Sequence, residues 1–81
     1  MKQYRTRGTC SSVIHYDIAE GKVVNVRFEN GCRGNLQGIA ALVEGRPVEE
    51  VVQRLSGIQC RNGTSCPDQL ARALRAELEN A

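Results

Sequence analysis

Hydrophobic and polar residues alternate along two stretches near the start of the chain, residues 11–18 and 23–29. In the first stretch the two isoleucines and the tyrosine share one face, and in the second stretch Val24, Val26 and Phe28 do. A period of two predicts strands with one buried face. The segment AEGK between them contains a glycine and predicts a hairpin loop. We therefore expect an antiparallel β-hairpin.

From residue 36 onward the hydrophobic residues recur every three or four positions, which predicts helices. The three helical stripes are Leu36, Ile39, Ala40 and Val43; Val48, Val51, Val52 and Leu55; and Leu70, Ala71, Leu74 and Leu78. Gly45 and Gly57 end the first two helices, and Pro47 and Pro67 suit the first turns of the last two. The predicted order is β-β-α-α-α, an α+β fold whose helices cover one face of a small sheet.

The length of 81 residues predicts one domain, residues 1–81, with a polar lead-in at residues 1–9 that we expect to be flexible. Its core is thin, because the chain has one Phe, two Tyr and no Trp. Small domains with thin cores usually need disulfides, a metal or a partner subunit. Four cysteines are available for the first two of these solutions.

The first residues, MKQYRTRGTC, lack the apolar segment of a signal peptide, and no apolar run is long enough for a transmembrane helix. We therefore expect a cytoplasmic protein without membrane partners. The net charge is only +2, and no aromatic residues interleave with the scattered arginines, so we expect no nucleic-acid binding. In a reducing cytosol, four cysteines favour metal binding or redox chemistry over structural disulfides.

The four cysteines, Cys10, Cys32, Cys60 and Cys66, all fall at the ends of predicted elements and not within an apolar stripe. Cysteines at helix starts have a lowered thiol pKa, and glycines beside a ligand let backbone N–H groups approach its sulfur. If the helix starts share one end of the sheet, the four thiolates converge on one metal ion. No CxxC spacing supports this site independently. The residues expected to support it are Gly31, Gly34, Ser65 and Asp68.

Other chemistry has weaker support in the sequence. His15 is a candidate fifth ligand, although an ordinary strand histidine is the commoner case. One histidine without a paired acid argues against a serine or cysteine hydrolase, so we expect no catalytic residues. Cys60 and Cys66 are the closest cysteine pair in the sequence, which leaves thiol–disulfide exchange as an alternative.

The segment TSCPDQLARAL resembles the signature of the TSCPD-domain family, and GTCSSVIHYDI, GKVVNVRFENGCRGNLQGIAALVEGRPVEEVV and GIQC extend the resemblance over nearly the whole chain. The family includes small stand-alone bacterial proteins. It also includes the C-terminal domain of adenosylcobalamin-dependent ribonucleotide reductases, where the cysteines are thought to bind metal. The resemblance implies that Cys10, Cys32, Cys60 and Cys66 are ligands. It implies no reductase activity, because the reductase barrel is missing from this chain.

A fainter resemblance is to the U-type scaffold proteins of iron–sulfur assembly, whose three cysteines would correspond to Cys10, Cys32 and Cys66. The chain departs from that pattern where Ser11 and Ser12 replace an acidic residue and Ser65 replaces a histidine. It also lacks the Leu-Pro-Pro-Val-Lys loop and adds a fourth cysteine. These departures favour a closed site that retains its metal over one that transfers a cluster.

The favoured hypothesis is a small module with one zinc ion bound by four cysteines, serving structure and interaction with a partner protein. The first alternative is an iron–sulfur cluster on the same residues, and the second is a thiol–disulfide redox protein. A homodimer stays open. No motif indicates a flavin or another small-molecule cofactor.

Overall fold

A computed structural model describes residues 2–6, 9, 11–30, 33–59 and 63–79 of the chain. Its elements are β1 (Lys2–Arg5), β2 (Val13–Ala19), β3 (Lys22–Glu29), α1 (Arg33–Val43), α2 (Val48–Leu55) and α3 (Cys66–Glu79). The predicted α+β class, the hairpin and the three helices that follow it are confirmed. The order is β-β-β-α-α-α, with one more strand than the sequence predicts.

The additional strand, β1, lies where the sequence predicts a flexible lead-in. It pairs antiparallel with β2, and half-buried Tyr4 lies opposite Ile14 on the core side of the sheet. The segment KQYR contains a single large apolar residue, so its own pattern is too short to show a period of two. It becomes a strand because the edge of β2 offers unpaired backbone groups.

An irregularity in β3 decides which of its valines enters the core. Along the hairpin His15 pairs with Arg27, but Asp17 pairs with Val24, so β3 contains one extra residue. Asn25 lies there with a φ of 57°, a left-handed conformation that asparagine tolerates better than most residues. The bulge shifts the alternation, so Val23 is fully buried and Val24 is not. The prediction of Val24 as a core residue was therefore wrong.

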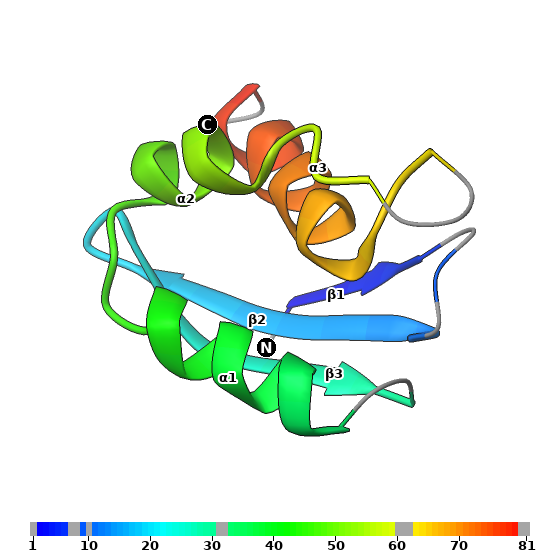
Figure 1. The fold of residues 1–81 in the computed structure, drawn as a ribbon. Helices are drawn as coiled ribbons and strands as arrows, with labels where there is room; N and C mark the ends of the chain where they lie inside the picture. Colours follow the sequence, from blue (N-terminus) through cyan, green and yellow to red (C-terminus); the bar gives the residue numbers. More distant parts are fainter. Residues whose placement is uncertain (1, 7–8, 10, 31–32, 60–62, 80–81) are drawn as a thin grey trace.

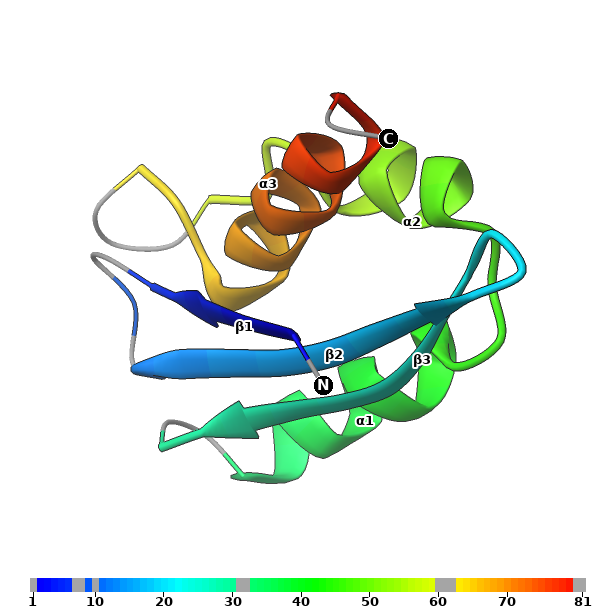
Figure 2. The same cartoon turned by 180° about the vertical axis from the view of Figure 1, so that it is seen from behind.

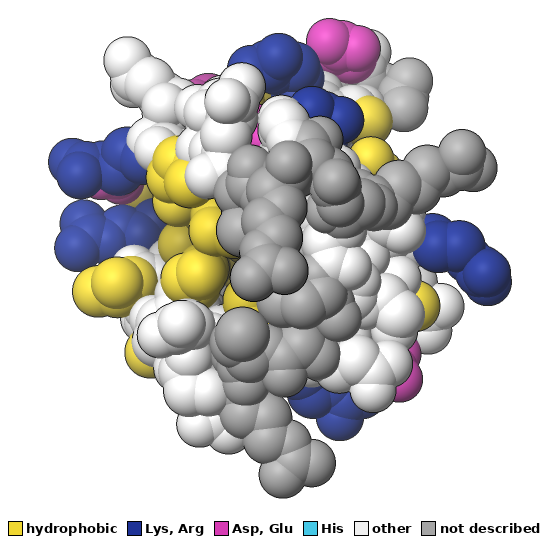
Figure 3. Space-filling view, turned by 45° about the vertical axis from the view of Figure 1, so that its right-hand side comes forward, with side chains coloured by type: hydrophobic (Ala, Val, Ile, Leu, Met, Phe, Trp, Pro, Cys, Tyr) yellow, Lys and Arg dark blue, Asp and Glu magenta, His cyan; other side chains and the backbone are white. Residues whose placement is uncertain are grey.

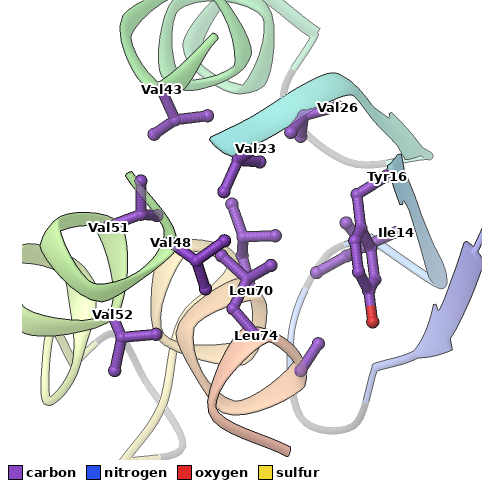
Figure 4. Packing of buried hydrophobic residues seen from close by; sticks show 11 residues of the cluster. Ile14, Tyr16, Val23, Val26, Val43, Val48, Val51, Val52, Leu70 and Leu74 are labelled. Atoms are coloured by element: carbon purple, nitrogen blue, oxygen red, sulfur yellow. The ribbon is translucent and has the colours of Figure 1, made fainter. Parts of the chain in front are cut away.

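The sheet has the order β1-β2-β3, with α2 and α3 packed against each other and α1 running along β3 (Figures 1 and 2). All three helices contribute to one hydrophobic core with the sheet (Figure 4). Ile14 and its cross-strand partner Phe28 both contact this core, so the helices share one face of the sheet, as predicted. The largest fully buried side chains are Ile14, Val23, Val48, Val51, Leu70 and Leu74.

Backbone hydrogen bonds attach the connection between α1 and α2 to the hairpin. Gly45, with a φ of 77°, donates its N–H to the Val23 carbonyl at 2.7 Å, and the Val23 N–H donates to the Arg46 carbonyl at 2.9 Å. Gly57, with a φ of 83°, follows α2, so both predicted glycine stops are confirmed. None of the helices described in the structure combines the length and apolar character needed to cross a membrane.

Candidate site at the start of α3

Cys66 is the first residue of α3, and its side chain is buried, with an exposed fraction of 5%. Its Sγ lies 3.0 Å from the Oγ of Ser11, a buried residue that precedes β2. Either atom can donate in this contact. The sulfur therefore lies at the start of a helix and beside a hydroxyl group.

Ser65 caps the helix that Cys66 begins. Its Oγ accepts a hydrogen bond from the Asp68 backbone N–H at 3.2 Å and donates one to the Ile58 carbonyl at 2.6 Å. Its carbonyl accepts the Gln69 N–H at 2.8 Å. Ser65 is therefore the N-cap, and Cys66 is the first residue of the helix.

Asp68 connects the start of α3 to the end of α2. One carboxylate oxygen accepts the Gly57 backbone N–H at 2.7 Å, and the other accepts the Thr64 hydroxyl at 2.6 Å and contacts Arg72 Nε at 3.0 Å. Burial acts to raise the pKa of Asp68, but the bonds from Thr64 and Gly57, together with Arg72, outweigh it and hold the pKa below its usual value. The buried, charged carboxylate therefore joins the end of α2 to the start of α3, in addition to interacting with the helix dipole.

Thr64 and Gln69 complete this network, and the sequence analysis missed both. Gln69 is 3% exposed, and its Nε2 donates to the Thr64 hydroxyl at 3.0 Å. The available signal was the spacing of Thr64 and Asp68, four residues apart across a helix start, where a hydroxyl can reach a carboxylate. A glutamine at a helix position gives no sequence signal of burial, because glutamine is usually exposed.

The strand ends nearby are joined by hydrogen bonds through Ser12. Its backbone N–H donates to the Glu29 carbonyl at 2.9 Å, and its carbonyl accepts the Thr6 N–H at 3.0 Å. Its hydroxyl oxygen accepts a bond from Asn30 Nδ2 at 2.8 Å. Ser11, which precedes β2, also contacts Cys66 at the start of α3. One end of the molecule therefore brings together the end of β1, the start of β2, the end of β3 and the start of α3 (Figure 1).

The other predicted ligands, Cys10, Cys32 and Cys60, and the supporting Gly31 lie outside the described residues. Of the remaining supporting residues, Ser65 and Asp68 belong to the network around Cys66, and Gly34 lies in the first turn of α1. Within the described part of the chain, no three His, Cys, Asp or Glu side chains are close enough to hold a metal ion. The predicted site is therefore represented here by Cys66 and its surroundings.

His15, the candidate fifth ligand, is buried in the middle of β2. Its Nε2 contacts a carboxylate oxygen of Glu29 on the neighbouring strand. Both residues alternate with core residues of their strands. The contact gives His15 a structural role in joining β2 to β3.

The amino-acid pattern of the TSCPD domain matches residues 2–78. The chain belongs to the TSCPD-domain family. Comparison with curated proteins and comparison with solved structures each found no match. The fainter likeness to U-type scaffolds therefore rests on the order of elements and the placement of cysteines alone.

In this TSCPD domain the signature residues 64–68 form the helix start described above. Thr64 and Asp68 bond to each other, and Ser65 caps the helix. Pro67 occupies the first turn, where a missing N–H costs no helical hydrogen bond. The hydrogen bonds of Thr64, Ser65 and Asp68 join the start of α3 to the end of α2 and to the Ile58 carbonyl, next to the buried Cys66.

Proposed function

We propose that this TSCPD domain is a small cytoplasmic metal-binding module. It holds one Zn²⁺ through Cys10, Cys32, Cys60 and Cys66 and acts by binding a partner protein. The observation that carries the proposal is the buried Cys66, fixed by a polar network where three strand ends meet the start of α3.

The described neighbours of all four cysteines belong to one hydrogen-bonded region. Cys10 directly precedes Ser11, which contacts Cys66. Cys32 follows Asn30 by two positions, and Asn30 bonds to Ser12. Cys60 follows Ile58 by two positions, and the Ile58 carbonyl accepts the Ser65 hydroxyl. The support for the proposal therefore comes from the described flanking residues Ser11, Asn30 and Ile58, which hydrogen bonds join to the surroundings of Cys66.

The donor set suits zinc. Four thiolates complete a tetrahedral shell without an open position for substrate, which is the pattern of structural zinc. The bound ion supplies a cross-link, and its binding free energy adds to the folding free energy of a domain with a thin core. Ser11 contributes by orienting the Cys66 sulfur and by donating a hydrogen bond to it when it is a thiolate.

The two alternatives make different demands on Cys66. An iron–sulfur cluster would use the same four thiolates, so it differs from zinc in composition and colour. Thiol–disulfide exchange requires a thiolate that an external thiol can reach. The 5% exposure of Cys66 favours metal binding over exchange at this position.

The test is elemental analysis and an absorption spectrum of the full chain purified without oxygen. We expect one zinc per chain, no visible absorption, and loss of zinc in each of the four single Cys→Ser variants. The matched variant Ser11→Ala keeps all four cysteines and should keep one zinc while weakening its binding by roughly tenfold. Iron with sulfide in place of zinc would contradict the zinc proposal and support the iron–sulfur alternative. Four titratable thiols without any metal would contradict both the zinc proposal and the iron–sulfur alternative.

A further inference from the structure

A groove between α1 and α2 exposes apolar side chains to solvent. It has a volume of about 320 Å³ and is lined by Leu42, Val43, Arg46, Glu50, Val51, Arg54 and Leu55. Leu42 is 74% exposed, more than any other large hydrophobic side chain in the described residues. Figure 3 shows hydrophobic side chains gathered beside basic ones on one face of the molecule. An exposed apolar groove with a charged rim is typical of an interaction surface.

The rim of this α1–α2 groove has an excess of positive charge. Arg46 and Arg54 both pair with Glu50, at 3.8 Å and 3.2 Å. Their side chains are 59% and 74% exposed, and one carboxylate cannot neutralise two guanidinium groups. The arginines therefore keep donors available for carboxylates on a ligand, and arginine is enriched at protein interfaces.

We propose that the α1–α2 groove binds an amphipathic helix of a partner protein, with leucine-like residues on one face and acidic residues beside them. This proposal rests on the proposed function, in which the domain binds a partner protein. The groove would be the surface that contacts that partner. Both walls are helices whose backbone groups bond within the helix, so the groove offers no strand edge to an extended peptide. Recognition must use side chains, and a helix presents apolar anchors at the three- and four-residue spacing that such a groove accepts.

A second copy of this chain is a poorer occupant. The exposed candidate segment is the end of α3, where Leu78 is 38% exposed beside Glu77 and Glu79. Glu77 already accepts the Tyr16 hydroxyl and pairs with Lys2, so its carboxylate is engaged within the chain. Docking of α3 into the groove of another copy would also be head-to-tail, a contact that extends into open chains unless the rotation happens to close a ring.

The experiment selects peptides on the full chain as it is purified without oxygen. The probe is a displayed library of helical peptides of about 16 residues, long enough to form a helix, with leucines at i, i+3, i+4 and i+7. The positions beside the leucines vary among Glu, Gln and Lys. We expect enrichment of Glu-flanked peptides and weaker binding at high salt, because the rim arginines are exposed.

Two variants within the groove test whether the peptides bind there. Two matched variants outside the groove control for the effect of adding a negative charge elsewhere on the surface. Leu42→Asp and Arg54→Glu should each weaken the selected peptides roughly tenfold, and neither residue is buried, so folding is preserved. Leu78→Asp and Arg27→Glu make the same changes at other exposed positions and should leave binding unchanged.

The proposal is overturned by equal enrichment of Lys-flanked peptides, by the absence of any selected peptide, or by selected peptides that bind the Leu42→Asp variant normally. Self-association abolished by Leu42→Asp would assign the groove to a second copy and also overturn it. Zinc content is measured on the same samples. Groove binding without zinc would contradict the proposed metal site alone, whereas zinc without groove binding would contradict the proposed groove alone.

Discussion

The first turns of α2 and α3 are held in place by different kinds of interaction. At α2 the cap position is Pro47, which makes no side-chain cap hydrogen bond, and the helix is held by its buried valines. Its first N–H, that of Val48, donates to the Gly21 carbonyl of the hairpin at 2.9 Å. At α3 the cap is Ser65, and the surrounding Thr64, Asp68 and Gln69 are all buried polar residues.

The difference follows from what each helix start must position. Apolar contacts are non-directional, and the valines of α2 hold it against the core by burial of their side chains. Hydrogen bonds are directional, and a satisfied buried network specifies one arrangement of its atoms. The chain uses the directional solution where a cysteine begins the helix, as expected if the Cys66 sulfur must be placed accurately.

The largest difference between the two helix starts should appear when their third residues are exchanged for alanine. Asp68→Ala leaves the buried Thr64 hydroxyl and the Gly57 N–H without their acceptor, and should lower the free energy of unfolding by about 2–3 kcal/mol. The matched variant at α2 is Glu50→Ala, which removes ion pairs to two exposed arginines and should cost less than about 1 kcal/mol. Urea unfolding with a chelator present measures both values without a contribution from metal. Equal losses would show that the buried network adds nothing beyond a surface pair.

A smaller effect is expected from the cap itself. Ser65→Ala removes the acceptor of the Asp68 N–H and the donor to the Ile58 carbonyl, and should cost about 1–2 kcal/mol. The comparison is Ser56→Ala at the end of α2, which removes a hydroxyl that donates to the Val52 carbonyl of its own helix and accepts an exposed hydrogen bond from Arg75 Nη2 at 3.0 Å. We expect a loss below about 0.5 kcal/mol there, since that carbonyl also accepts the Ser56 N–H. Thermal unfolding of the two variants, followed by circular dichroism, would contradict this interpretation if Ser56→Ala were the less stable.

The smallest effect concerns the far end of α3, where Tyr16 donates to a Glu77 carboxylate oxygen at 3.0 Å. Burial, followed by the hydrogen bond and charge of Glu77, raises the pKa of Tyr16 above its ordinary value of 10.0. A raised pKa means that this stabilisation is fully present below about pH 10 and is lost as the pH rises above it. Tyr16→Phe should cost about 1 kcal/mol at pH 7.

Above pH 10 the wild type should lose about 1.4 kcal/mol per pH unit relative to the Phe variant, so their order of stability should reverse. Urea unfolding at a series of alkaline pH values measures the gap between the two proteins. A gap that stays constant from pH 7 to above pH 10 would mean that the Tyr16 pKa is the same in the folded and unfolded chains.

The comparison of the helix starts also shows which parts of the structure were predictable. The valines of α2 lie three and four residues apart, and this spacing alone predicts its position and its buried face. At α3 the sequence predicts the start and the role of Pro67, but not that Asp68 turns inward to the Gly57 N–H. That contact joins residues from two helices across a loop, and no local pattern encodes such a pairing.

The same distinction holds in the sheet. The alternation of β2 predicts its core face, whereas β1 is too short to show a period and exists because β2 offers it a partner edge. In β3 the bulge at Asn25 depends on pairing with β2, so the sequence assigns Val24 to the core where the structure buries Val23. Both errors come from pairing between strands, which a pattern along one segment does not contain.

The sequence by itself determined the α+β class, the hairpin, the three helices, the family and the cysteine at the start of α3. Each of these depends on local periodicity, on glycine and proline stops, or on a contiguous signature. Tertiary structure alone decided the third strand, the buried network around Cys66 and the groove between α1 and α2. These features join residues distant in sequence, and their free energies come from contacts that exist only after the chain has folded.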